Sequence, residues 1–264
     1  MLITLLTDFG TADYFVGAMK GVILSINPEA VVVDITHEVA PQDVREGAFT
    51  LSAAYVSFPA GTIHVAVVDP GVGSARRGIL VAGGGQYFVG PDNGLFSFIY
   101  ERSSDARVFQ LTNKKYFGPK VSATFHGRDI FAPVAAALSR GEAVEEFGEE
   151  IKDYVRLPDL KPRRTGDRTI EATIIHIDRF GNCVTNLTPA ELGAEIPATG
   201  ARLTINDREI TSFRRFFAEG EGGPGELFAI WGSAGYLEIA ANRASAALLL
   251  KAERGHKIVV MSDE

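Results

Sequence analysis

Short apolar runs alternate with amphipathic stretches over the first third of the chain. The first run, residues 1–7, is continuously apolar, which is typical of a strand buried on both faces of a parallel sheet. The stretches between the runs carry apolar residues at helical spacing and end beside prolines. Strands are expected at 1–7, 30–36 and 62–69, and helices within 8–27 and 41–58. This order predicts right-handed βαβ units and an α/β sheet.

The pattern changes after residue 70. Residues 78–94 predict a hairpin with Gly83–Gly85 in its turn, and residues 126–141 predict one more amphipathic helix. A charged, proline-containing stretch then gives way to seven short alternating segments, typical of an antiparallel barrel. We predict a mostly parallel α/β sandwich domain over 1–157, a linker over 158–168 and an antiparallel β-barrel domain over 169–264.

Composition narrows the choice of partners and compartment. The chain has 264 residues and a net charge of −7, which argues against a nucleic-acid partner. Its single cysteine, Cys183, cannot form an internal disulfide and fits a reducing compartment. The apolar N-terminal run lacks a basic region and a cleavage site, and no segment approaches 18 apolar residues. We therefore expect a cytoplasmic protein with no membrane partner.

Two carboxylates follow predicted strands. Ligands of open α/β sheets bind beyond the carboxyl ends of the strands, where Asp8 and Asp69 are expected. Asp8 could bind the two hydroxyls of a ribose, or it could cap the following helix. Asp69 is followed by a turn that could return Arg76 or Arg77 toward it, either for function or as a loop ion pair of little energetic value.

Further candidates lie at a helix start and in the C-terminal half. His126 is suited to proton transfer near neutral pH, although a lone histidine is usually structural. Asp178 ends a strand before a turn in which Phe180 could stack on a base and Asn182 could read an adenine edge. The alternative there is an Asx-type turn with a core aromatic. Small residues over 231–246 would admit a flat ligand.

Several motifs are missing from the sequence. No GxGxxG follows the first strand, and there is no Walker loop, so the usual phosphate cradles are not indicated. No HxxxH or CxxC pair suggests a metal site. We expect no bound metal and no cofactor.

Six motifs in order resemble one family. "LLTDFG", "VVDPGVGSARR", "GPDNG", "TFHGRDIFAP", "DRFGN" and "GSAGYLEIAAN" are together similar to the S-adenosyl-L-methionine (SAM) hydroxide adenosyltransferases, relatives of fluorinases and chlorinases. The resemblance covers nearly the whole chain. It implies an α/β domain, a β-barrel domain and a homotrimer with active sites between subunits. It also implies cleavage of SAM to adenosine and methionine by water attacking ribose C5′.

The resemblance also implies roles for individual residues. The family's catalytic set falls on Asp69, Arg76 and His126, with Arg76 preferred to Arg77 by its spacing from the aspartate. The implied substrate-binding residues are Asp8, Asp13, Phe125, Gly127, Asp178, Phe180, Asn182, Ser233, Asn242 and Arg243.

Departures from the halogenating relatives point to water as the nucleophile. Those enzymes carry a tyrosine and a small hydroxyl residue where this chain has Asp69 and Val72, and a tyrosine at His126. A carboxylate within about 4 Å would oppose a halide by several kcal/mol in a partly dry site.

Two other functions stay open from the residues alone. One is a metal-dependent nucleotide phosphatase using Asp8, Asp13 and Asp69, and the other is a non-catalytic SAM or adenosine sensor.

Overall fold

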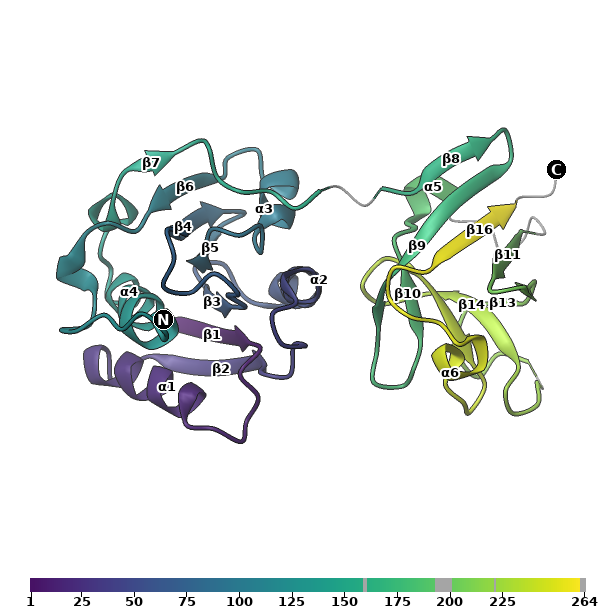
Figure 1. Cartoon of the computed structure of the whole chain (residues 1–264), viewed down its shortest axis with the longest axis horizontal. Helices are drawn as coiled ribbons and strands as arrows, with labels where there is room; N and C mark the ends of the chain where they lie inside the picture. The colour runs from purple at the N-terminus through teal and green to yellow at the C-terminus, as the bar shows by residue number, and fades with distance from the viewer. Residues whose placement is uncertain (159–160, 193–200, 221, 262–264) are drawn as a thin grey trace. The chain divides into compact units, whose positions relative to one another are not determined.

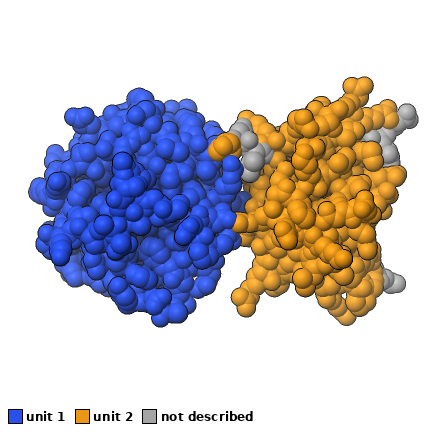
Figure 2. Space-filling model, in the orientation of Figure 1, with its two compact units in different colours: residues 1–157 blue, residues 158–264 orange. Residues whose placement is uncertain are grey.

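Two compact units make up the chain. The computed structural model describes residues 1–158, 161–192, 201–220 and 222–261. Its units are Met1–Leu157 and Pro158–Glu264, coloured separately in Figure 2. Parts of the predicted linker (159–160) and of the predicted C-terminal domain (193–200, 221 and 262–264) lie outside the described residues.

The N-terminal unit is built on a mixed, mainly parallel sheet (Figure 1). Its strands are β1 (Leu2–Thr7), β2 (Val31–Thr36), β3 (Ile63–Val67), β4 (Gly78–Gly83), β5 (Gln86–Pro91), β6 (Arg107–Gln110) and β7 (Glu150–Ile151). They lie in the order β2-β1-β3-β5-β4-β6-β7, and the first four of these are parallel. β4 and β5 form the predicted antiparallel hairpin. The parallel α/β prediction is confirmed.

Helices cover both faces of this sheet. They are α1 (Phe15–Ile26), α2 (Val44–Ala54), α3 (Ser97–Arg102) and α4 (Ala132–Ser139), with short 3-10 turns at Tyr55–Ser57, Lys114–Tyr116 and Val144–Phe147. Met19 and Ile23 of α1 pack with α4 and one sheet face. Leu51 of α2 and Phe98 of α3 pack on the other face. The unit is therefore a three-layer sandwich.

Two helix starts differ from the prediction. α1 begins at Phe15, well after Asp8, so Asp8 does not cap it. The helix predicted over 126–141 opens with a π-helical turn, Gly127–Phe131, before α4. Single π-turns of this kind are frequent at functional sites.

Strand order creates a crevice at one sheet edge. β1 lies between β2 and β3. The connection after β1 therefore leads to one side of β1, and the connection after β2 leads to its other side. β1 and β3 pair in parallel, with Thr7 opposite Val67. Asp8 and Asp69 therefore emerge at the same edge, at the switch point where open α/β sheets bind ligands.

The C-terminal unit is a curled, mostly antiparallel β-structure. Within the described residues its strands are β8 (Arg163–Gly166), β9 (Thr169–Ile177), β10 (Cys183–Thr185), β11 (Arg202–Ile205), β12 (Arg208–Ile210), β13 (Phe213–Arg214), β14 (Leu227–Trp231), β15 (Leu237–Ala241) and β16 (Lys257–Met261). Two short helices accompany them, α5 (Pro189–Leu192) and α6 (Ala246–Leu250). Ile174, Leu203 and Ile258 belong to its apolar core.

Two details of this unit depart from the predicted pattern. Residues 163–166, which we assigned to the linker, form β8, because their backbone pairs with β9 despite their charged side chains. β13 and β14 pair in parallel, unlike the other strand pairs described in this unit.

Candidate active site

A pocket of about 380 Å³ opens where β1 and β3 end. Three predicted site residues line it together, Asp8, Asp69 and His126. Phe125 and Gly127 complete the set of predicted residues in its wall. Asp8 and Asp69 come from strand ends, and His126 comes from the segment that leads into the π-helical turn. Segments far apart in sequence thus place two carboxylates and an imidazole around one cavity.

Asp69 and Arg76 form a buried two-point ion pair. Arg76 Nε donates to Asp69 Oδ1 at 3.1 Å, and Nη2 donates to Oδ2. Both side chains are less than a tenth exposed. Burial raises the pKa of the Asp69 carboxyl above its ordinary value, while Arg76 and the Gly71 backbone oppose that rise. Asp69 is therefore held in place and is more basic than a solvent-exposed carboxylate.

Arg76 also fixes the tautomer of His126. Its Nη2 lies 3.0 Å from His126 Nδ1, and a guanidinium can only donate. Nδ1 therefore carries the lone pair, and the proton of the neutral ring is on Nε2. Burial and the positive charge of Arg76 lower the pKa of His126, against the opposing effect of Asp69. The ring is neutral near physiological pH.

The guanidinium of Arg76 is almost fully occupied. Besides Asp69 and His126, it donates from Nη1 to the Arg77 carbonyl at 3.0 Å, and it lies 5.5 Å from the Phe131 ring centroid. Four of the five guanidinium N–H groups are thereby used. Arg76 is not part of the pocket lining. Arg76 therefore lies behind Asp69 and His126, the two residues that face the cavity.

The neighbouring arginine belongs to a different network. Arg77 pairs with buried Asp92 at 2.7 Å and with exposed Asp153 at 2.9 Å. Spacing in the sequence favoured Arg76 for the site, and the geometry places Arg76, not Arg77, beside Asp69 and His126.

A close backbone approach joins the two loops that carry this cluster. Gly73 has φ +77°, and a β-carbon there would overlap the Ala123 carbonyl oxygen. The turn after β3 therefore packs directly on the segment before His126. Only glycine combines this conformation with this proximity.

Asp8 is held by the loop before α2. Its Oδ2 accepts a hydrogen bond from the Gln42 backbone N–H at 2.7 Å. Gln42, which has φ +67°, also lines the pocket, as do Pro41 and Thr124. These three residues were not predicted. Thr124 opens the "TFHGRDIFAP" motif, whereas nothing in the local sequence of Pro41 and Gln42 marks a loop that reaches the cavity only through the tertiary fold.

Aromatic side chains form one wall of the pocket. Phe9, Phe15 and Phe125 contact one another, with ring centroids 5.1–5.9 Å apart. A β-carbon at Gly127 would lie 3.1 Å from Met19 and 3.3 Å from Phe125, so the glycine allows this close packing. The wall offers apolar and ring faces to a ligand beside the charged cluster.

Asp13 does not join the pocket. It lies in the exposed bend before α1 and is absent from the pocket lining. A hard-cation site made from Asp8, Asp13 and Asp69 therefore finds no support. The described residues also contain no group of three or more His, Cys, Asp and Glu side chains arranged to hold a metal ion.

The C-terminal candidates occupy turns of the β-unit. Asp178 accepts three hydrogen bonds at 2.9 Å, from the Phe180 and Asn182 backbone N–H groups and from Asn182 Nδ2. The Asx-type turn considered from the sequence is therefore present. Asn182 is buried, whereas Phe180 is 78% exposed and free of the core.

The remaining candidates flank β15. Asn242 donates to the Gly222 and Gly223 carbonyls, and Arg243 has φ +52°. This end of β15 adjoins the 178–182 turn, since Ala247 N–H donates to the Gly181 carbonyl at 2.9 Å. Ser233 lies in the turn before β15, at the other end of that strand.

The fold and the pocket together define a class: a two-unit enzyme with an Asp–Arg–His cluster at the switch point of its α/β unit. Residues 3–148 match the SAM hydroxide adenosyltransferase N-terminal domain, and residues 172–259 match the C-terminal domain of the same family. The chain therefore belongs to the SAM hydroxide adenosyltransferase family.

Individual relatives agree with this assignment. The (R)-S-adenosyl-L-methionine hydrolase of Salinispora tropica is 40% identical, over 98% of this chain and 97% of that protein. A fluorinase of Nocardia brasiliensis is 26% identical, over 98% and 96% of the two chains. The crystal structure of an uncharacterized conserved protein from Thermotoga maritima superposes with a TM-score of 0.90 at 36% identity, over 99% of this chain and all of that one.

Helix lengths bear on the expectation that the chain has no membrane partner. Among the described residues, no helix is both long and apolar enough to cross a membrane.

Proposed function

We propose that this protein hydrolyses SAM to adenosine and L-methionine by direct attack of water on ribose C5′. The observation that carries the proposal is the Asp69–Arg76–His126 cluster at the pocket, in a chain of this family. The water oxygen bonds to C5′, the C5′–sulfur bond breaks, and its electron pair neutralises the sulfonium. One proton leaves the water.

Asp69 is the acceptor of that proton. It lines the pocket, and burial makes it more basic than a free carboxylate. His126 cannot take the proton at Nδ1, because that nitrogen accepts from Arg76. His126 instead orients the water by donating from Nε2. Positioned proton transfer of this kind contributes about 10²–10⁴-fold to a rate.

Arg76 is a positioning residue in this mechanism. It holds Asp69 at two points and sets the tautomer of His126, without lining the cavity. A weak nucleophile gains most from such orientation, which can supply about 7–11 kcal/mol of the barrier. Methionine leaves the sulfonium readily as a neutral thioether, so no acid is required to protonate the leaving group.

The remaining predicted residues bind the substrate. Asp8 takes the ribose hydroxyls, and the aromatic wall with Phe125 and Gly127 faces the nucleoside. Asp178, Phe180, Asn182, Ser233, Asn242 and Arg243 contact the adenine and methionine ends, from a neighbouring subunit of a homotrimer. Asp13 lies between Phe9 and Phe15, which both line the pocket, and we propose that it meets the substrate from this bend. A cytoplasmic location fits a chain with one cysteine, which is buried.

The direct test is chromatography of SAM after incubation with the protein. We expect adenosine and methionine in equal amounts, with a chelator and with added chloride making no difference. A 5′-halogenated nucleoside as the main product would contradict the proposal. Tight binding of SAM without methionine release would identify a sensor, and loss of activity in chelator would favour a metal-dependent hydrolase.

The pH dependence of kcat/KM follows from the two pKa shifts. The pKa of Asp69 lies above its ordinary 3.8, and that of His126 lies below its ordinary 6.5. Both groups therefore gain protons on the acid side of neutrality, which removes the proton acceptor and breaks the Arg76–His126 hydrogen bond. We expect kcat/KM to fall as pH is lowered from neutrality. A rate unchanged down to about pH 4 would exclude these roles.

A further inference from the structure

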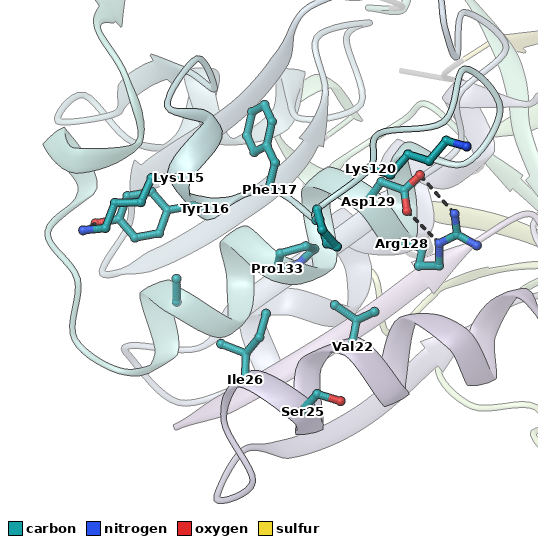
Figure 3. A pocket seen from close by; sticks show the side chains of 13 residues that line it. Val22, Ser25, Ile26, Lys115, Tyr116, Phe117, Lys120, Arg128, Asp129 and Pro133 are labelled. Atoms are coloured by element: carbon teal, nitrogen blue, oxygen red, sulfur yellow. Dashed lines mark hydrogen bonds and ion pairs between the residues drawn. The ribbon is translucent and has the colours of Figure 1, made fainter.

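A second and larger cavity is lined in part by Arg128 and Asp129 of the π-helical turn. Its volume is about 630 Å³, within the range of small-molecule sites. It is bounded by α1, by the loop over 115–120 and by the start of α4, as Figure 3 shows. The proposed function makes no use of it.

The walls of this cavity are mainly apolar. Val22 and Ile26 project from α1, with Phe117 and Pro133 across from them in Figure 3. Pro119 also lines the cavity. A cavity with such walls favours an apolar ligand body over a phosphate or a sugar, because polar ligands would lose hydration without gaining partners.

Positive charge is concentrated at one end of the cavity. Lys120 and Arg128 line the same end of the cavity in Figure 3, where Arg128 is paired with Asp129. Arg128 binds Asp129 through Nε at 2.6 Å and Nη2 at 3.1 Å, and no hydrogen bond from its Nη1 is found among the described residues. Lys120 is exposed and lies within salt-bridge distance of no acidic side chain in the described part of the chain.

The charges there sum to one positive unit. Asp129 is buried, accepts from Ser122 N–H at 2.8 Å and is paired with Arg128. Although burial raises its pKa, these partners hold it below the ordinary value, so it stays ionised. With Lys120 and Arg128 positive and Asp129 negative, one cation is uncompensated.

The other end of the cavity holds one lysine with a carboxylate nearby. Lys115 lies 4.9 Å from the Tyr116 ring centroid, and Tyr116 donates its hydroxyl to Glu142 at 2.8 Å. The Glu142 carboxylate thus lies close to Lys115 through the Tyr116 hydroxyl, so an anion is favoured more at the Lys120–Arg128 end. This contrasts with a chain whose net charge is −7.

We propose that this cavity is a binding site for a monocarboxylate with an apolar body. The carboxylate is bound by the Lys120 ammonium and by Arg128 Nη1, and the apolar body lies along Val22 and Ile26. A single carboxylate matches the single uncompensated charge, and the apolar walls match a hydrocarbon or aromatic body.

The site shares a wall with the catalytic pocket. Arg128 and Asp129 line the second cavity, while the two residues before them, His126 and Gly127, line the first. A ligand held by Arg128 therefore contacts the π-helical turn that also positions His126.

The test is calorimetric titration of the full-length protein with decanoate, decanol and decyltrimethylammonium. We expect saturable binding of one equivalent of decanoate, at least about tenfold tighter than either of the other two probes. Equal affinity for decanoate and decanol would overturn the proposal, and so would preferred binding of the cation.

Paired variants locate the binding. Lys120→Gln should weaken decanoate binding about tenfold, whereas Lys114→Gln, a nearby exposed lysine outside the lining, should not. Val22→Glu should abolish binding, whereas Leu24→Glu, on the exposed side of the same helix, should leave it intact. Circular dichroism confirms that each variant is folded. Equal effects within either pair would place the ligand elsewhere.

Discussion

Asp69→Asn is expected to reduce kcat for SAM hydrolysis by about 10²–10⁴-fold, with little change in adenosine affinity. Asparagine keeps the size of the side chain and can accept one hydrogen bond from Arg76. It cannot take a proton from the attacking water. Adenosine release followed by chromatography gives the rate, and calorimetric titration with adenosine gives the affinity.

Stability must be measured alongside, because the substitution leaves a buried cation. Arg76 is less than a tenth exposed, and breaking a buried pair typically costs about 3–5 kcal/mol of unfolding free energy. A lower melting temperature is therefore expected, and assays should be run well below it. If folded Asp69→Asn that binds adenosine turns over SAM at the wild-type rate, Asp69 is not the proton acceptor.

Arg76→Lys is expected to lower kcat/KM by about two orders of magnitude, whereas Arg77→Lys should leave it within about twofold. A lysine ammonium cannot contact both Asp69 oxygens and the His126 ring in the planar arrangement of a guanidinium. Arg77 has the same chemistry and is adjacent in sequence, but its partners are Asp92 and Asp153. The comparison separates positioning at the site from the general loss of an ion-paired arginine.

Two further readouts distinguish positioning from simple destabilisation. In Arg76→Lys the acid limb of the pH profile should move, because the His126 tautomer is no longer set by the same donor. In Arg77→Lys the melting temperature should fall while the pH profile stays unchanged. Similar activity losses in both variants, with unchanged pH profiles, would show that Arg76 acts only through stability.

The α/β architecture could be predicted because local pattern and tertiary role coincide there. The apolar runs of β1 and β3 are buried strands, and their carboxyl ends define the switch point. Placing Asp8 and Asp69 at one edge followed from those strand assignments alone. All seven alternating segments of the C-terminal half contain strands, for the same reason.

Other features depend on contacts that no local pattern carries. Gln42 reaches the pocket because its loop folds back onto Asp8. β8 forms from charged residues because β9 offers a pairing edge, and edge pairing needs backbone rather than apolar side chains. The π-helical turn after His126 could not be predicted either, because the apolar periodicity of 126–141 predicts one continuous helix.

The contact between Gly73 and the Ala123 carbonyl gives the cluster a weak point as well as its geometry. Asp69 and His126 lie on two loops that are joined by this backbone contact and by Arg76, so their alignment can be lost without melting of the whole unit. Separation of the two loops at the Gly73–Ala123 contact would abolish activity while the sheet remained folded. Inactivation on warming should therefore precede loss of secondary structure.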